Sequence, residues 1–171
     1  MKKYLLVSLL IFLILFAGFA RADAVLGIPD RTSAATLLVP MFEVAINPAA
    51  DSLNTLPIIT NTGGSAVTVH YEVWDVMGNS TPIFGNFPLA PFETRPMSVR
   101  ALIDPASPAT KAQLTDGDYW RGFMTFDVVT ASTALRPIDV GYPFSTANVL
   151  EGWIYYVRLL QGSSNGLSWF Q

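Results

Sequence analysis

The stretch VTVHYEVWDV, residues 67–76, decides the fold class. Its apolar and polar residues alternate, which places two sets of side chains on opposite faces of an extended chain. One face carries Val67, Val69, Tyr71 and Val73, and the other carries Thr68, His70, Glu72 and Trp74. Alternation of this kind is typical of a β-strand with one buried side. We therefore expect the first face to lie in a hydrophobic core and the second to be mostly exposed to solvent.

Similar short segments recur along the chain. They cover residues 36–46, 56–60, 95–103, 121–130 and 153–160, and clusters of Gly, Pro, Asn, Asp and Ser separate them. One short helix is expected over residues 108–114, where Ser107 provides a cap before a proline. Short strands at this spacing predict an all-β sandwich or barrel.

The turn residues suggest how some of these segments pair. The NTGGS stretch at residues 61–65 predicts a hairpin that joins 56–60 to 67–76, because its glycines accept positive φ. Residues 95–103 alternate and are expected to form a half-buried strand. Asp116 followed by glycine marks a tight turn.

Prolines and aromatic residues indicate the positions of other strands. Pro40 lies inside the apolar segment 36–46, which indicates an edge or bulged strand. Two prolines within residues 86–91 argue against long strand pairing there. Residues 153–160 carry aromatic side chains on both faces, so we expect a central strand. Residues 131–148 have no regular pattern and are interpreted as a long connection.

Residues 1–22 have the three parts of a secretory signal peptide. Two lysines precede an apolar run over residues 4–20, which ends at the small-x-small tripeptide ARA. The alternative is a retained membrane anchor, because the run approaches the roughly 20 residues that span a bilayer. We expect cleavage before Asp23, export to the periplasm or the extracellular space, and a single β-sandwich domain over residues 23–171.

The composition excludes several kinds of site. The 171 residues include no Cys and one His, which excludes disulfides, Cys-ligated metals and multi-histidine centres. Ten basic and 13 acidic residues give a net charge of −3, which argues against a nucleic-acid surface. We expect no cofactor, no nucleic-acid partner and no membrane span after signal cleavage. The apolar stretch 167–171 directly follows a loop, which favours a domain that is incomplete at its C-terminal end.

His70 and Glu72 are the first candidate site residues. They share one strand face two positions apart, so they could supply two metal ligands or an acid–base pair. A third ligand is not indicated by any spacing in the sequence. The simpler interpretation is a polar stripe that faces solvent.

Other catalytic patterns are weaker. Residues 162–166 read G-x-S-x-G, but this hydrolase motif needs a following helix and a later acid and histidine, so a flexible loop is the simpler interpretation. Asp116, Gly117 and Asp118 could bind calcium but lack the ligand series of an EF-hand. A glycosidase would need two of the carboxylates that lie in or beside strands. These are Glu43, Glu72, Asp75, Glu93, Asp127 and Glu151.

The aromatic residues offer a binding surface. Trp74 lies on the predicted polar face with His70, and Tyr119 and Trp120 flank the Asp-Gly turn. Exposed rings beside polar groups can stack on sugars, whereas most tryptophans fill cores or interfaces. The candidate ligand-binding residues are therefore Trp74, His70, Glu72, Tyr119 and Trp120.

Three stretches together resemble a group of uncharacterised secreted bacterial proteins that open with T-L-L-V-P-x-F-E-V. They are TLLVPMFEV at 36–44, ITNT with VHYEVW at 59–62 and 69–74, and LAPFET with MSVR at 89–94 and 97–100. Residues 56–103 also resemble bacterial immunoglobulin-like domains. The resemblance implies an antiparallel immunoglobulin-like β-sandwich of about seven to eight strands, and it assigns no catalytic or binding residue.

We expect a non-enzymatic domain with a role in structure, adhesion or assembly. Its open sheet edges could receive a strand from another protein chain, because unpaired N–H and C=O groups template strand addition. The alternatives are a carbohydrate-binding module that uses the exposed aromatics, with a glycan as partner, and a secreted hydrolase.

Overall fold

The computed structural model describes residues 33–49 and 51–158. The predicted signal peptide, the G-x-S-x-G stretch and residues 167–171 lie outside this part of the chain. The described elements are β1 (Thr36–Ala45), β2 (Asn54–Asn61), β3 (Val67–Trp74), β4 (Ser80–Leu89), β5 (Thr94–Pro96), α2 (Val99–Ile103), α3 (Pro108–Leu114), β6 (Thr115–Asp116), β7 (Tyr119–Val129) and β8 (Leu150–Val157). None of these helices is long and apolar enough to cross a membrane.

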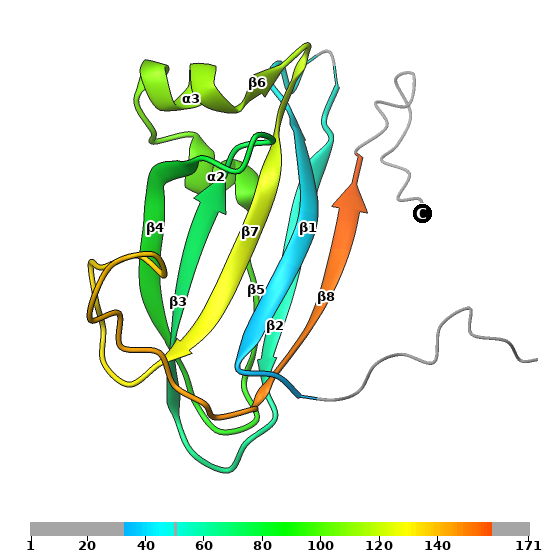
Figure 1. The fold of residues 1–171 in the computed structure, drawn as a ribbon. Helices are drawn as coiled ribbons and strands as arrows, with labels where there is room; N and C mark the ends of the chain where they lie inside the picture. The colour runs from blue at the N-terminus through cyan, green and yellow to red at the C-terminus, as the bar shows by residue number, and fades with distance from the viewer. Residues whose placement is uncertain (1–32, 50, 159–171) are drawn as a thin grey trace, which may run out of the picture. The chain divides into compact units, whose positions relative to one another are not determined.

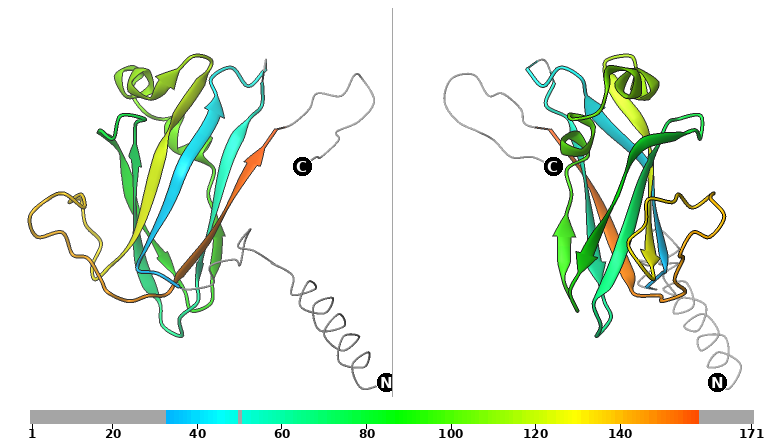
Figure 2. Two further views of the ribbon diagram at one scale, coloured as in Figure 1. Left: turned by 45° about the vertical axis from the view of Figure 1, so that its right-hand side comes forward. Right: turned by 90° about the vertical axis from the view of Figure 1, so that its left-hand side faces the viewer.

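The strands form two antiparallel sheets. The larger sheet has the order β1-β7-β3-β4, with β6 paired to the start of β7, and the smaller has the order β5-β2-β8 (Figure 1). The two sheets face each other as layers, and the helices α2 and α3 lie at one end (Figure 2). The prediction of an all-β, antiparallel sandwich of seven to eight strands is confirmed.

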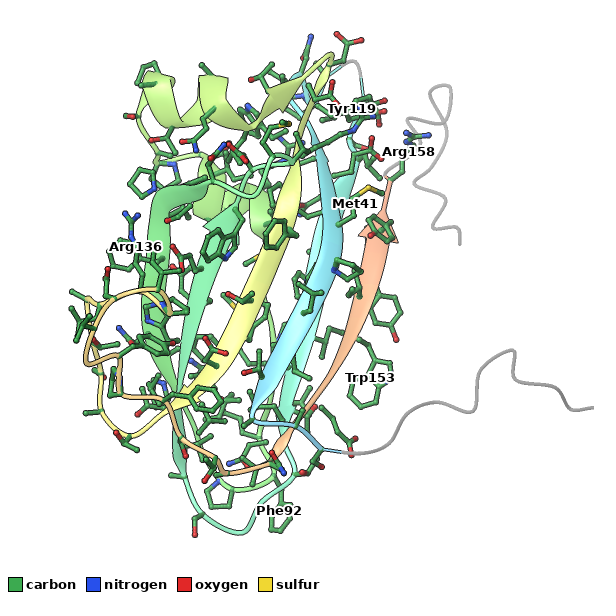
Figure 3. The ribbon with its side chains drawn as sticks, viewed as in Figure 1. Met41, Phe92, Tyr119, Arg136, Trp153 and Arg158 are labelled. Atoms are coloured by element: carbon green, nitrogen blue, oxygen red, sulfur yellow. The ribbon has the colours of Figure 1, made fainter. Side chains whose placement is uncertain are left out.

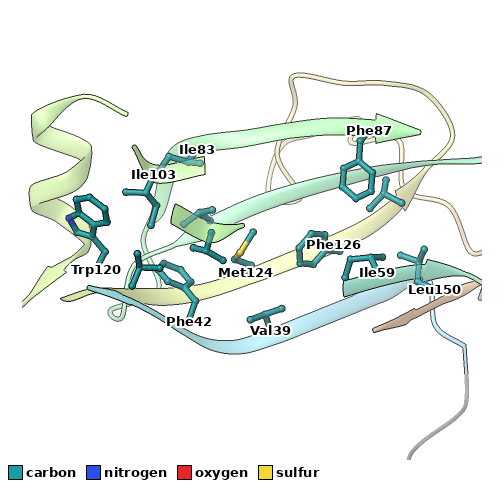
Figure 4. Close-up of a cluster of buried hydrophobic side chains, with 14 of the residues drawn as sticks. Val39, Phe42, Ile59, Ile83, Phe87, Ile103, Trp120, Met124, Phe126 and Leu150 are labelled. Atoms are coloured by element: carbon teal, nitrogen blue, oxygen red, sulfur yellow. The ribbon is translucent and has the colours of Figure 1, made fainter. Parts of the chain in front are cut away.

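The hydrophobic core lies between the two sheets (Figure 4). Strand β7 supplies Met124, Phe126 and Val128 at alternate positions, as the segment 121–130 predicts. Trp120, which precedes that segment, joins them in the core. Strand β3 adds Val69 and Val73, and Ile59 of β2 closes the core from the smaller sheet. The two-residue period of these strands therefore determines which side chains meet in the core.

Strand β1 is a bulged edge strand, as Pro40 predicts. Its register with β7 shifts between Val39 and Phe42, and within the described part of the chain β7 is its only strand partner. Phe42 then lies opposite Gly122, where a Cβ atom would be 1.9 Å from the carbonyl oxygen of Trp74. The absence of a side chain at residue 122 therefore allows β1, β7 and β3 to approach closely.

The predicted hairpin between 56–60 and 67–76 is wrong. Strand β2 pairs with β5 and β8, whereas β3 pairs with β4 and β7 in the other sheet. The chain therefore crosses from one sheet to the other between β2 and β3. The buried Asn61 stabilises this crossing, because its Nδ2 donates to the carbonyls of Ser65 and Ala90 at 2.8 and 3.0 Å. This turn connects two layers instead of two neighbouring strands.

The predicted strand over 95–103 is also wrong. The short β5 is followed by the helix α2, whose cap Ser98 accepts a hydrogen bond from the N–H of Ala101. Val99 and Ile103 are both fully buried, and residues four apart share a helix face as well as a strand face. The helix α3 forms as predicted, with Ser107 accepting from the N–H of Thr110.

Two expectations about strand position need correction. Strand β4 includes Pro82 and Pro88 yet pairs with β3 up to Leu89, since prolines are tolerated on an edge strand. Strand β8 is an edge strand, because β2 is its only strand partner in the described part of the chain. Its aromatic side chains therefore are not packed between two layers.

We expect Gly122→Ala to lower the free energy of unfolding by about 3 kcal/mol or more, because the added methyl group meets a backbone oxygen that cannot move aside. Urea denaturation followed by tryptophan fluorescence measures this. The control is Gly64→Ala, where a Cβ meets nothing within 4 Å, so its change should stay within about 0.5 kcal/mol. Equal stability of the two variants would contradict the packing described for Gly122.

Candidate functional site

His70 and Glu72 are buried, so the prediction that their face is mostly exposed is wrong. Their exposed fractions are 1% and 0%. The irregular segment 131–148, here called the covering segment, leaves the end of β7 and lies beside β3 and β4 (Figure 1). Asn86 of β4 fixes it, because its Nδ2 donates to the carbonyl of Thr133 at 2.6 Å. The long connection predicted here therefore covers the outer face of the larger sheet.

Glu72 is the centre of a buried polar cluster. The hydroxyl of Ser80 donates to Glu72 Oε1 at 2.5 Å, and Arg136 Nη1 of the covering segment donates to Ser80 Oγ at 2.7 Å. Arg136 Nε lies 3.8 Å from the same carboxylate oxygen, and its guanidinium lies over the ring of Phe84. Burial nevertheless raises the pKa of Glu72, although Ser80 and Arg136 act in the opposite direction.

Asp127 and His70 connect the rest of this cluster. Asp127 accepts hydrogen bonds from the hydroxyls of Thr36 and Tyr142, at 2.6 and 3.0 Å. Burial and the nearby Asp127 carboxylate raise the pKa of Tyr142. The rings of Tyr142 and His70 meet in a T-shaped contact, and His70 Nδ1 lies 3.2 Å from Asn86 Oδ1. The cluster thus joins the covering segment to β1, β3, β4 and β7.

This cluster contains the residue types of an acid–base site, but its His70, Glu72 and Asp127 side chains are buried. His70 Nε2 and Glu72 Oε2 are buried and have no hydrogen-bond partner among the residues that the structure describes. In residues 33–49 and 51–158, no group of three or more His, Cys, Asp or Glu side chains is placed to hold a metal ion. The contacts support a structural role, in which the cluster attaches the covering segment to the sheet.

The other acidic candidates make local interactions. Glu43 and Asp116 both pair with Arg121, and Gly117 takes the positive φ of a tight turn, as predicted. Asp75 accepts from the N–H groups of Met77 and Asn79 in the turn after β3.

The predicted aromatic platform is not formed as expected. Trp120 is 6% exposed and packs in the core, so it lies on the opposite face of β7 from Tyr119. Trp74 is half-buried and stacks on Phe123, with ring centroids 5.7 Å apart. Tyr119 donates its hydroxyl to Asp51 at 2.8 Å, which raises the pKa of Tyr119. The structure does not gather these rings into one exposed group.

A pair of exposed aromatic residues lies instead on one face of β8. Trp153 and Tyr155 are 50% and 53% exposed, and their side chains point away from the core on the same face of the strand. They lie opposite Ile58 and Leu56 of β2 in the sheet register. We call these four residues the aromatic face, and Trp153 is labelled there in Figure 3. Their two-residue spacing was visible in the sequence, but the expectation of a central strand concealed their exposure.

The backbone of β8 has a defined pattern of free groups. Leu150 exchanges both of its backbone hydrogen bonds with Ala34, each at 2.9 Å, on the side away from β2. Because successive residues of a strand direct these groups to alternate sides, the N–H and C=O of Gly152, Ile154 and Tyr156 also point away from β2. They have no strand partner in the described residues. We call these three residues the free edge.

The other sheet edges are less accessible to a new strand. Pro82 and Pro88 in β4 lack N–H donors, and β5 has only three residues and ends at Pro96. Strand β1 is interrupted by its bulge at Pro40. Its Glu43 N–H also donates to Thr55 Oγ1. Strand β8 has eight residues, contains no proline and pairs with β2 without a register shift. It is therefore the edge best suited to strand addition.

No protein-family model, curated protein or solved structure matches this chain. The resemblance to secreted bacterial proteins and to immunoglobulin-like domains therefore stays a prediction.

We expect Glu72→Gln to remove a pH-dependent contribution to stability. A raised folded-state pKa stabilises the fold below the unfolded value of about 4.3, and this contribution is lost as the pH rises through the folded pKa. The free energy of unfolding of the parent, relative to that of Glu72→Gln, should therefore fall with rising pH. Urea denaturation at a series of pH values from about 4 upwards measures it.

The control is Glu93→Gln, for which we expect the pH dependence of the free energy of unfolding to have the opposite sign. The Glu93 carboxylate accepts hydrogen bonds from the backbone N–H of Ala90 and from Arg95, and both lower the pKa of Glu93. The stability that Glu93 contributes is present above the unfolded pKa and is lost as the pH falls through the folded pKa. Parallel pH profiles for the two variants would contradict the burial described for Glu72.

Proposed function

We propose that the protein is an exported, non-enzymatic β-sandwich module that acts in assembly or adhesion by binding an extended polypeptide along β8. One observation carries the proposal: the backbone N–H and C=O groups of Gly152, Ile154 and Tyr156 on an unbroken edge strand have no strand partner among residues 33–49 and 51–158. Strand addition to such an edge supplies main-chain hydrogen bonds to the incoming segment.

The side chains of β8 could add specificity to this binding. Trp153 and Tyr155 lie on the outer side of the sheet beside the free edge. An incoming strand would place every second side chain next to these rings, and cross-strand aromatic pairs contribute roughly 0.2–1 kcal/mol each. The partner is therefore expected to be an extended segment with apolar residues at alternate positions.

Export is supported by the sequence of residues 1–22. Their charged start, apolar run and small-residue cleavage site are the features of a secretory signal. The resemblance to secreted bacterial proteins agrees with this compartment. A strand-binding module is compatible with the periplasm or the cell exterior, where β-sandwich domains are common.

The hydrolase alternative receives less support. His70 and Glu72 would need to meet a substrate, but both side chains are buried beneath the covering segment. The hydrogen bonds of Ser80 and Arg136 already engage the Glu72 carboxylate and close this side of the site.

Gly152→Pro should weaken the binding of strand-forming peptides, because it removes one of the free N–H donors. Peptides about nine residues long, enough to span β8, would be selected from a random phage-displayed library against the purified protein. Fluorescence anisotropy of the selected peptides should show at least about tenfold weaker binding to the proline variant, the effect of about one hydrogen bond.

The matched control is Gly152→Ala, which also adds a Cβ but keeps the N–H. That Cβ would meet the flexible end of Leu37 at 3.0 Å, so the site can adjust. Selected peptides that bind both variants equally well would contradict a role for the free edge.

Glycan binding is a second candidate, favoured by the exposure of Trp153 and Tyr155 on one face. Two rings at this spacing can stack on neighbouring sugar units, and they replace the predicted platform of Trp74, Tyr119 and Trp120. Here the rings would be essential and the free N–H groups would not.

If glycans bind, Trp153→Ala should remove the signal on a glycan array, while Trp74→Ala should keep it, because Trp74 is stacked on Phe123. Gly152→Pro should retain glycan binding, which separates this candidate from strand addition. Glycan binding that persists in Trp153→Ala would contradict a role for the aromatic face in binding sugars.

A further inference from the structure

We infer that the partner of the free edge is a second copy of this chain, which pairs β8 with β8 antiparallel about a two-fold axis at Ile154. This inference rests on the proposed function, since it names the polypeptide that β8 receives. The axis follows from the free groups, which belong to Gly152, Ile154 and Tyr156 and are centred on Ile154.

The register of this pairing follows from the symmetry. A two-fold axis at Ile154 places Ile154 opposite its own copy and Gly152 opposite Tyr156 of the second copy. Both arrangements are hydrogen-bonded pairs of an antiparallel ladder, in which two residues exchange both backbone bonds. All the free groups of the edge are then satisfied, and the two three-stranded sheets become one continuous sheet.

The side chains suit this register. Trp153 comes to lie opposite Tyr155 of the second copy in a non-hydrogen-bonded pair, where side chains approach most closely. The four exposed rings then gather on one face beside Ile58 and Leu56. On the other face Tyr156 of the second copy lies opposite Gly152, and each Tyr156 hydroxyl donates to the Met41 carbonyl of its own chain at 2.7 Å.

The charges of β8 also favour pairing with itself. Near a two-fold axis each residue approaches its own copy, so a charged side chain there would face a like charge. Residues 152–157 carry no charge, and Glu151 is three positions from the axis. The two copies of Glu151 are separated by about 20 Å along the strands, which is beyond the screening length of about 8 Å at physiological salt.

Ala34 sets the limit of the paired segment. Its bridge to Leu150 occupies the edge just before Gly152, so a second copy can add only after that point. The remaining edge is symmetric about Ile154, which is the requirement for an isologous interface.

Sedimentation velocity over a range of protein concentrations tests the dimer. We expect the parent and Gly152→Ala to form dimers, and the dissociation constant of Gly152→Pro to be at least about tenfold higher. Circular dichroism of each variant shows whether it is folded. A folded Gly152→Pro variant that dimerises as well as the parent would overturn the inference.

Single cysteines test the register, since the chain has no cysteine of its own. A hydrogen-bonded antiparallel pair has Cα atoms about 5.5 Å apart, within the range of a disulfide. Ile154→Cys should therefore form a covalent dimer under mild oxidation. In Val157→Cys, the control on the same strand, the two cysteines would lie about 20 Å apart and should stay unlinked. Cross-linking of Val157→Cys but not Ile154→Cys would overturn the register.

The outcomes separate this inference from the proposed function. A monomeric parent that binds selected peptides only when residue 152 keeps its N–H would overturn the second copy as partner and retain strand addition. A monomer that binds no peptide would overturn both. A dimer sensitive to Gly152→Pro and cross-linked through residue 154 supports both.

Discussion

The side chain of Asn61 fixes the point at which the chain passes from one sheet to the other. It is fully buried, and its amide donates to Ser65 and Ala90 while its oxygen accepts from the N–H of Gly63. Buried carbonyl groups need hydrogen-bond partners, and here one amide supplies those that a hairpin ladder would have provided. Because this crossing separates β2 from β3, their inner faces can pack against each other around a common core.

Local sequence patterns predicted the secondary-structure elements better than they predicted which strands pair with each other. The alternation in 67–76 and 121–130 correctly identified β3, β7 and their core residues, and Pro40 identified the bulged edge strand. A two-residue period defines faces, but it does not determine which strand lies alongside. Val99 and Ile103 fit both a strand and a helix, and the cap at Ser98 is the local signal that favours the helix.

The candidate site was less predictable for a related reason. The pattern correctly placed His70 and Glu72 on the face opposite the core, but it contains no information about a distant segment that packs over that face. The covering segment itself has no periodicity, and its contacts through Asn86, Arg136 and Tyr142 are non-local. Conversely, the aromatics of β8 were predicted to be buried because apolar residues on both faces usually indicate a central strand.

The entry of the chain into β1 has a mechanical consequence. Ala34 exchanges two hydrogen bonds with Leu150 in the smaller sheet, and the next residue, Ala35, accepts one from Val128 in the larger sheet. Tension applied to the polypeptide ahead of Ser33 is therefore shared by both layers from the outset. A domain pulled from that end would therefore lose hydrogen bonds in both sheets at once, instead of releasing one strand at a time.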